Sequence, residues 1–137
     1  MNSVLLDTDC LVALLDRRDH SHRRCVELVP TLPPPLLTSE SVIAESIYLL
    51  RHVDGAAQAI LEDVRNGTYQ LAHNLSARAA EVSRLMTKYA DVPMDLADAC
   101  LVDLATQLGT GRILTLDGDF TIYRWGRNRP FELLIDI

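Results

Sequence analysis

The chain has 137 residues, which is the length of one domain, so we expect a single domain over residues 1–137. Hydrophobic residues make up 48% of the sequence and charged residues 23%, a balance that excludes a disordered or fibrous chain. The formal charge of −6 argues against a protein that coats nucleic acid by bulk positive charge, but it does not exclude a local basic site.

The N-terminal half of the chain alternates short apolar runs with helical patterns. In chain order, we expect a strand over 4–6, a helix over 11–15 capped by Thr8 or Asp9, a helix from the charged stretch 16–24 to about residue 29, a strand over 36–38, and a helix from Ser39 to about residue 53. The run Pro33-Pro34-Pro35 separates the second helix from the second strand, because proline cannot continue a helix.

The C-terminal half continues the same alternation. We expect a helix over 56–65, a strand over 69–72, a helix from Ser76 to about residue 89, a helix from Asp95 to Gly109, a strand over 112–116, a turn over 117–119, and a last strand over 131–135. Short apolar strands that alternate with helices predict an α/β fold, with a central parallel sheet of four to five strands and helices on both faces. In such sheets the functional crevice lies at the carboxyl ends of the strands.

The sequence predicts a soluble cytoplasmic protein. No run of 18 apolar residues occurs, so we expect no membrane span. The first apolar run has no basic region before it and stops at Asp7, so we expect no signal peptide. The three cysteines, Cys10, Cys25 and Cys100, are an odd number at wide spacing, which does not suggest a disulfide framework or a zinc site.

Two acidic residues follow predicted strands. Asp7 comes directly after the strand over 4–6, and Asp117 directly after the strand over 112–116. Each of them, taken alone, is also explained as a turn or cap aspartate. Because the carboxyl ends of parallel strands meet at one edge of a sheet, the two side chains are also candidates for one site.

Asp98 lies near the start of the helix from Asp95 to Gly109. On a helical wheel it falls at the edge of the apolar face, whereas Asp103, Thr106 and Gln107 mark the solvated face. The alternative is structural, because Asp95 as N-cap and Asp98 three residues later form an acidic version of a capping box.

Glu45 stands midway along a helix whose apolar residues cover nearly the whole circumference, so we expect its side chain to be buried. It has no basic residue three or four positions away. A buried carboxylate without a partner either takes up a proton or binds a cation. A partly exposed glutamate remains the alternative.

We therefore expect four acids from four separate elements to meet at one end of the predicted sheet: Asp7, Glu45, Asp98 and Asp117. Two carboxylates ~4 Å apart repel each other by about 4 kcal/mol at an effective dielectric constant of 20. Such a cluster is typical of a metal site, and oxygen ligands favour Mg²⁺ or Mn²⁺ over zinc.

The sequence resembles the PIN-domain ribonucleases, specifically the VapC type of toxin from bacterial type II toxin–antitoxin pairs. The resemblance rests on an ordered set of motifs that spans nearly the whole chain: Leu5-Leu6-Asp7-Thr8-Asp9, Leu11-Val12-Ala13-Leu14-Leu15-Asp16, Asp19-His20-Ser21-His22, Thr38-Ser39-Glu40, Val42-Ile43-Ala44-Glu45, Met94-Asp95-Leu96-Ala97-Asp98-Ala99 and Leu114-Thr115-Leu116-Asp117-Gly118-Asp119-Phe120.

This resemblance implies a PIN-like fold and a Mg²⁺- or Mn²⁺-dependent endoribonuclease that cleaves structured cellular RNA and so inhibits translation and growth. The catalytic acids it implies are Asp7, Glu45, Asp98 and Asp117, and the metal ligands are Asp7, Asp98 and Asp117, with Asp119 as a second candidate for the last position. Asp9 and Asp95 would support these ligands. The resemblance also implies a homodimer and a small VapB-type antitoxin, with which the toxin forms a hetero-oligomer.

Arginines are candidates for contacts with RNA phosphates. They are Arg17, Arg18, Arg23, Arg24 and Arg124, with Arg127 and Arg129 nearby. Such contacts position RNA without reading its bases, although arginine-rich stretches are also common on solvated faces. Tyr123 and Trp125 are candidates for stacking a base, and a core role suits Tyr123 equally well. We assign no ligand role to His20 and His22, whose spacing does not place both on one helix face.

Two alternatives remain. Asp7-Thr8-Asp9 after a first strand also resembles the acid pair of a haloacid-dehalogenase-like phosphatase, but that chemistry needs a lysine, and Lys88 is the only one in the chain. The other alternative is a non-catalytic PIN module that binds RNA or protein, although a protein of that kind is expected to have lost its acids.

Overall fold

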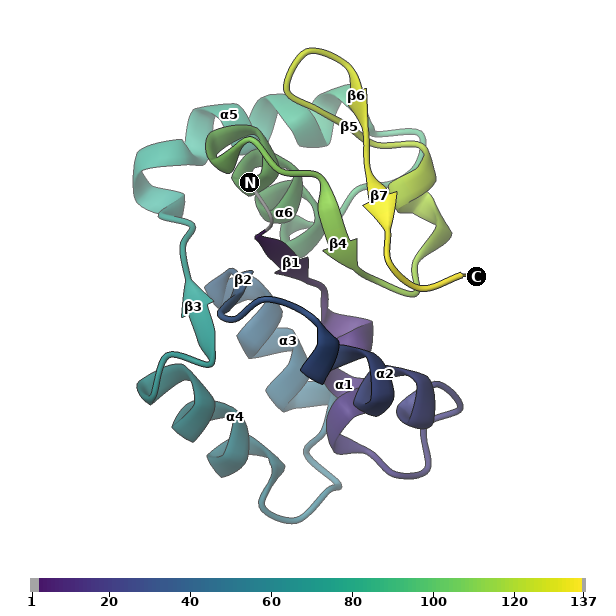
Figure 1. The fold of residues 1–137 in the computed structure, drawn as a ribbon. Helices are drawn as coiled ribbons and strands as arrows, with labels where there is room; N and C mark the ends of the chain where they lie inside the picture. Colours follow the sequence, from purple (N-terminus) through teal and green to yellow (C-terminus); the bar gives the residue numbers. More distant parts are fainter. Residues whose placement is uncertain (1–2, 137) are drawn as a thin grey trace.

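A five-stranded parallel sheet forms the centre of the computed structural model, which describes residues 3–136 (Figure 1). The strand order is β3-β2-β1-β4-β7. Their bounds are β1 (Val4–Leu6), β2 (Leu36–Thr38), β3 (Tyr69–Leu71), β4 (Arg112–Leu114) and β7 (Glu132–Leu133). The central strand, β1, is completely buried, as its apolar sequence predicts. The predicted parallel α/β fold is therefore confirmed.

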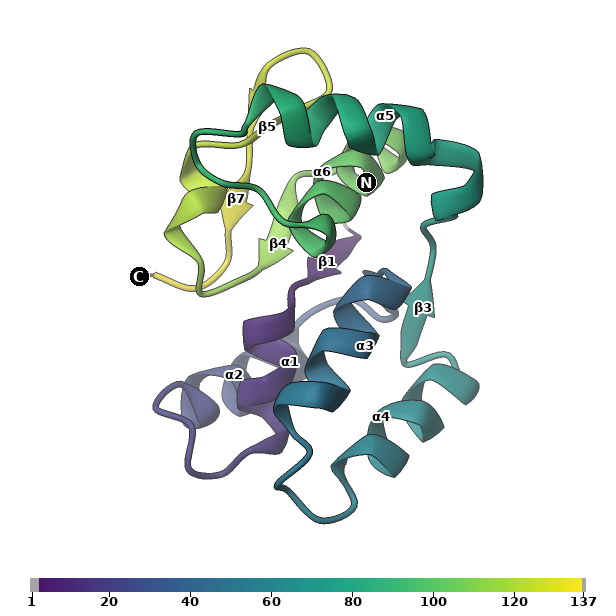
Figure 2. The same ribbon diagram turned by 180° about the vertical axis from the view of Figure 1, so that it is seen from behind.

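Helices flank this sheet. They are α1 (Thr8–Leu15), α2 (His22–Leu28), α3 (Glu40–Leu49), α4 (Ala56–Arg65), α5 (Leu75–Lys88) and α6 (Leu96–Leu108), with two short 3-10 helices, η1 (Val29–Thr31) and η2 (Gly118–Thr121). α3 and α6 lie toward the viewer in Figure 2, whereas α2 lies toward the viewer from the opposite side, in Figure 1. Within residues 3–136, no helix is both long and apolar enough to cross a membrane.

Several helix boundaries differ from the sequence-based expectation, because a neighbouring polar side chain is the actual cap. α1 begins at Thr8, and its N-cap is Asp7, whose side chain accepts a hydrogen bond from the Thr8 N–H. The N-cap of α5 is Asn74 rather than Ser76. The expected caps Ser39 and Asp95 are confirmed.

The predicted helix from Ser39 ends at Leu49, before the expected residue 53. The predicted strands over 112–116 and 131–135 shorten to β4 and β7.

The segment between η2 and β7 forms a two-stranded antiparallel hairpin that the sequence did not reveal. Its strands are β5 (Arg124–Trp125) and β6 (Arg129–Pro130). The Trp125 indole donates a hydrogen bond to the Pro130 carbonyl oxygen at 3.0 Å and lies against Gly111. A Cβ on Gly111 would stand 2.1 Å from the indole nitrogen, so this approach requires glycine.

A buried ionic cluster joins α5 and α6, and it corrects one expectation. Asp103 is not on a solvated face, because α5 covers it and its side chain is 0% exposed. Its carboxylate accepts hydrogen bonds from His73 Nε2 at 2.9 Å and from Arg78 at 2.9 and 2.7 Å. Burial raises the pKa of Asp103, but the hydrogen bonds from Arg78 and His73 outweigh it and leave the pKa below its usual value.

Candidate functional site

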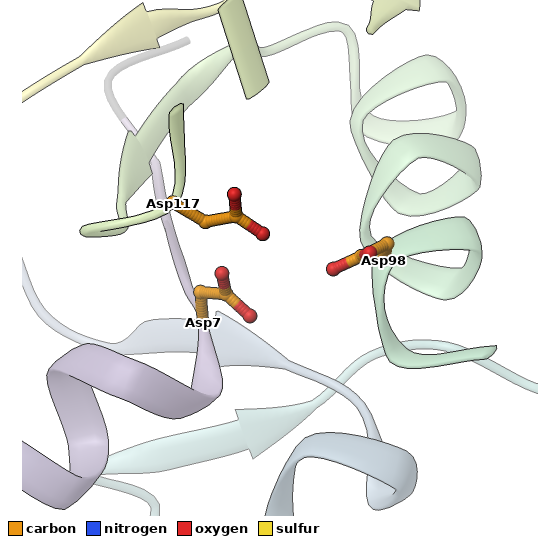
Figure 3. Close-up of side chains that lie close together, drawn as sticks. All are labelled: Asp7, Asp98 and Asp117. Carbon is orange, nitrogen blue, oxygen red and sulfur yellow. The ribbon is translucent and has the colours of Figure 1, made fainter. Parts of the chain in front are cut away.

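Three carboxylates meet at the carboxyl edge of the sheet (Figure 3). Asp7 follows β1, Asp117 immediately precedes η2 after β4, and Asp98 lies in the first turn of α6. One oxygen of each lies within 4.8 Å of one oxygen of each of the others. The structure thus brings these three of the predicted site residues together, and their catalytic and metal-binding roles stay predictions.

A threonine that we did not single out as a site residue links two of these acids. The Thr115 hydroxyl donates a hydrogen bond to Asp7 Oδ2 at 2.7 Å and accepts one from the Asp117 backbone N–H at 3.0 Å. Thr115 is fully buried, so its hydroxyl holds both acids in a fixed relation. Its position in the motif Leu114-Thr115-Leu116-Asp117 was the only sequence signal for it.

Asp98 takes part in both arrangements that its sequence position suggested, the capping box and the acid cluster. Its Oδ2 accepts the Asp95 backbone N–H at 3.3 Å, and Asp95 Oδ1 accepts the Asp98 backbone N–H at 2.8 Å, so the capping box is present. The same carboxylate faces Asp7 and Asp117 in Figure 3. Capping therefore fixes the side chain without removing it from the cluster.

The three acids line a pocket of about 310 Å³ whose other polar surface is also largely acidic. The lining residues are Asp7, Thr8, Asp9, Val12, Asp19, Glu45, Leu49, Asp95, Asp98, Leu116 and Asp117. None of these lining residues is basic. The pocket therefore carries a concentrated negative charge that favours a bound cation.

Burial of these acids opposes their ionisation. It raises the pKa of Asp7 well above its usual value, with repulsion from Asp9 as the next cause. Burial, followed by repulsion from Asp95, raises the pKa of Asp98 to about 7. Burial also raises the pKa of Asp9 to about 6, although Asp9 Oδ1 accepts the Leu116 N–H at 3.0 Å. A cation that offsets this repulsion would restore the ionised forms.

Glu45 does not have the burial that the sequence suggested. Its side chain is exposed, because α3 packs through one face and leaves Glu45 and Tyr48 on the other. Glu45 still lines the acidic pocket, but it is outside the three-carboxylate group. Asp119 is also outside this group, and its backbone N–H donates to Asp117 Oδ1 at 2.9 Å. Catalytic or ligand roles for these two residues stay predictions.

Four of the arginines lie between the end of α1 and the first turn of α2: Arg17 and Arg18 on the segment that joins the two helices, and Arg23 and Arg24 in α2 itself. All four are exposed, and Asp19, which follows Arg18 on the joining segment, lines the pocket. Arg18 and Arg23 form exposed salt bridges with acidic neighbours, and Arg24 donates to a backbone carbonyl near the C-terminus. Exposed ion pairs of this kind are weak, so an RNA phosphate could replace the carboxylate as the partner of the arginine.

The remaining arginine candidate, Arg124, has a different environment. Its guanidinium donates hydrogen bonds to the carbonyl oxygens of residues 121–123, at the end of η2. β5, which begins at Arg124, lies far from α1 and α2 in both views (Figures 1 and 2). Tyr123, the neighbouring candidate for base stacking, is 0% exposed, so that expectation is wrong and its core role is confirmed.

Fold and site together define an α/β protein with a carboxylate centre at the edge of a parallel sheet. Residues 4–125 match the PIN domain family. Ribonuclease VapC26 of Mycobacterium tuberculosis is 34% identical over 116 residues, which cover 83% of this chain and 86% of that protein. The crystal structure of VapC20 from the same organism, described as a sarcin-ricin loop cleaving toxin, matches with a TM-score of 0.81 at 22% identity, over 93% of this chain and all of that one.

The chain therefore belongs to the PIN-domain family, and its relatives are of the VapC type, as its motifs predict. The phosphatase alternative loses its basis. Lys88, the lysine that such chemistry needs, lies over the ring of Tyr89 and is not among the residues that line the pocket.

In metal-free buffer, the carboxylate centre is expected to destabilise the fold at neutral pH. Because the folded-state pKa values of Asp98 and Asp9 rise to about 7 and about 6, the folded protein keeps protons that the unfolded chain releases near pH 4. In metal-free buffer, the free energy of unfolding should therefore decrease as the pH rises from about 4 to about 7, by about 1.4 kcal/mol for each unit of pKa difference at most. Urea unfolding across this range measures the slope, and a stability that increases with pH would contradict it.

Asp98→Asn separates this repulsion from helix capping, because the amide oxygen can still accept the Asp95 N–H. In chelator at pH 8, we expect the variant to melt at or above the wild-type temperature. A purely structural role for Asp98 as an acid near the helix N-terminus, worth ~0.3–1 kcal/mol, predicts a lower temperature. Mg²⁺ at ten times its dissociation constant should add about 1.4 kcal/mol to the wild type and less to the variant.

Proposed function

We propose that this protein is the toxin of a VapBC-type pair, a Mg²⁺- or Mn²⁺-dependent endoribonuclease that cleaves structured cellular RNA and so inhibits translation and growth in the cytoplasm. The observation that carries the proposal is the group formed by Asp7, Asp98 and Asp117, whose oxygens lie within 4.8 Å of one another in an acidic pocket. The 34% identical relative, named as a ribonuclease, supports the same activity.

The donor set fits a hard divalent cation. Asp7, Asp98 and Asp117 offer only oxygen, and their repulsion is the cost that a cation offsets. Bound there, Mg²⁺ or Mn²⁺ would neutralise the carboxylates, hold the scissile phosphate and lower the pKa of a water molecule for in-line attack. The chain's own part is to hold the ligand oxygens in place, through Thr115 for Asp7 and through the capping box for Asp98.

The RNA substrate has a polyanionic backbone, and the pocket that it must approach is acidic. We therefore propose that basic side chains near the pocket attract the RNA. Arg17 and Arg18 are exposed on the segment that also provides Asp19 to the pocket wall, and Arg23 and Arg24 are exposed at the start of α2, which follows that segment. They would contact phosphates on either side of the cleaved bond and contribute affinity rather than base selection. Arg124 belongs to this set only if its contacts at the end of η2 are exchanged for RNA.

Metal-dependent cleavage of RNA is the direct test. Purified protein, freed of any bound partner by denaturation and refolding, is incubated with total RNA in Mg²⁺ or Mn²⁺ and in chelator, and the cleaved ends are mapped. We expect discrete cuts with either metal and none in chelator. RNA binding without cleavage under both metal conditions would instead favour the non-catalytic PIN module.

We also propose a VapB-type antitoxin that inhibits by filling the acidic pocket. An arginine of the antitoxin placed among the four acids Asp7, Glu45, Asp98 and Asp117 would replace the cation by pairing with the carboxylates. Expression of the protein alone should arrest growth, and co-expression of a small protein encoded beside it should relieve the arrest. The double variant Glu45→Gln, Asp98→Asn should bind that partner more weakly in calorimetry; unchanged affinity would contradict inhibition through the pocket.

The oligomer implied by the family is a homodimer, within a larger complex with the antitoxin. α5 and the start of α6 offer an apolar groove for the dimer to bury. The groove is lined by Leu75, Ala79, Val82, Ser83, Met86, Thr87, Ala90 and Leu96. Leu75 and Leu96 are each 40% exposed and share this groove with other apolar side chains, and contiguous exposed apolar surface is typical of a protein–protein contact.

A further inference from the structure

A buried tyrosine hydroxyl touches the carboxylate centre from the side of the protein core. Tyr123, between η2 and β5, is 0% exposed, and its hydroxyl donates a hydrogen bond to Asp98 Oδ2 at 3.2 Å. Phe120 and Tyr89 pack edge-on against its ring, each with a centroid distance of 5.1 Å. The ring is therefore fixed, and the direction of its hydroxyl is set by packing.

The Tyr123 hydroxyl and the Asp95 backbone N–H both donate hydrogen bonds to the same oxygen of Asp98. Oδ2 accepts these two donors, whereas Oδ1 accepts no hydrogen bond from the described residues 3–136. In Figure 3 the Asp98 carboxylate points toward Asp7 and Asp117. Two donors on one oxygen fix the rotation of the carboxylate and leave the other oxygen free for a cation.

We propose that Tyr123 is a positioning residue for metal binding, which orients the Asp98 carboxylate through a hydrogen bond from the core. The inference rests on the proposed metal-dependent function and extends it beyond the acids themselves. Tyr123 also follows Asp117 in the same segment, so its hydrogen bond to Asp98 links the segment of Asp117 to helix α6. Hydrogen-bond partners of metal ligands commonly change metal affinity by 10- to 100-fold.

Tyr123→Phe tests the proposal, because it removes one hydroxyl and keeps the packed ring. Isothermal titration calorimetry of the refolded variant with Mn²⁺ should show a dissociation constant roughly tenfold higher than that of the wild type. RNA cleavage should need correspondingly more Mn²⁺ but recover near the wild-type rate at saturation, since the hydroxyl does not face the substrate side of the pocket. Far-UV circular dichroism checks that the variant is folded.

Tyr89→Phe is the matched control. It removes a hydroxyl from the same aromatic cluster, but that hydroxyl accepts the Arg124 backbone N–H at 3.0 Å and does not contact an acid. We expect it to lower the melting temperature at least as much as Tyr123→Phe while leaving the Mn²⁺ dissociation constant at the wild-type value. An equal rise in both variants would show general loosening of the core and overturn the proposal.

The remaining outcomes separate this proposal from the function on which it rests. A wild-type dissociation constant in Tyr123→Phe, together with Mn²⁺ binding and cleavage by the wild type, would overturn the role of Tyr123 alone. A wild-type protein that binds no Mn²⁺ and cleaves no RNA would overturn the proposed function, and the role of Tyr123 with it. Failure of Tyr123→Phe to recover cleavage at saturating Mn²⁺ would also contradict a purely positioning role.

Discussion

Asp7→Asn is expected to reduce RNA cleavage by at least about 100-fold, because it removes a ligand from the centre, and loss of a mere hydrogen-bond partner of a ligand already costs 10- to 100-fold. The asparagine oxygen is a weaker ligand and carries no charge to offset that of the cation. The same variant should lose the stabilisation that Mg²⁺ gives to the wild type. Initial cleavage rates on one RNA, measured over a range of Mg²⁺ concentrations, provide the comparison.

The fold of this variant should remain intact. Asparagine is as good an N-cap as aspartate, so α1 keeps its cap. The repulsion that raises the pKa of Asp7 is also relieved, which favours the folded state in metal-free buffer. Asp136→Asn, at an exposed acid near the C-terminus, is the control for loss of one negative charge. Full cleavage by Asp7→Asn would remove the basis of the proposed mechanism.

Asp103→Leu is expected to destabilise the fold by about 3–5 kcal/mol, the usual result when one partner of a buried ion pair is removed. The side chain of Asp103 is 0% exposed and that of His73 only 1%. Leucine would leave the His73 ring without its acceptor, whereas Arg78, at 33% exposure, can turn toward water. For a domain of this length, such a loss lowers the melting temperature by roughly 10–20 °C.

Two further variants, Asp103→Asn and Glu81→Ala, are the controls for Asp103→Leu. Asparagine keeps the shape and one acceptor, so its cost should be smaller than that of leucine. Glu81→Ala breaks a pair with Arg84 on the surface of α5, and such pairs contribute at most about 1 kcal/mol. Thermal melts of the three variants in the same buffer rank them. A leucine variant that melts within about 2 °C of the wild type would mean that the cluster adds little stability.

The pH dependence of the cluster has the opposite sign to that of the metal centre. The pKa of Asp103 is lowered in the fold, so its contribution to stability is present above the pKa of the unfolded chain and is lost as the pH falls through the folded value. The pKa values of Asp7 and Asp98 are raised, so their contribution to stability decreases as the pH rises. The carboxylate centre therefore lowers stability toward neutral pH, whereas the Asp103 cluster loses its contribution to stability at low pH.

Features that depend on neighbours along the chain follow from the sequence alone. Apolar runs of three residues predicted the strands β1 and β2, and polar residues before helical patterns predicted the caps Ser39 and Asp95. The alternation of these elements predicted parallel pairing, and parallel strands bring their carboxyl ends to one edge. Asp7 and Asp117 each follow such a strand, and their carboxylates lie together in the structure.

Which face of each helix is covered, and by which element, depends on the packing of the whole fold. Helical periodicity indicated which residues share a face, but α3 leaves Glu45 exposed, whereas α5 covers Asp103 and supplies Arg78 as its partner. The contacts of Thr115 and Tyr123 with the acids join residues 25 to 108 positions apart. Burial and hydrogen bonding at such separations depend on how elements pack in space, and no pattern within a short stretch of sequence carries that information.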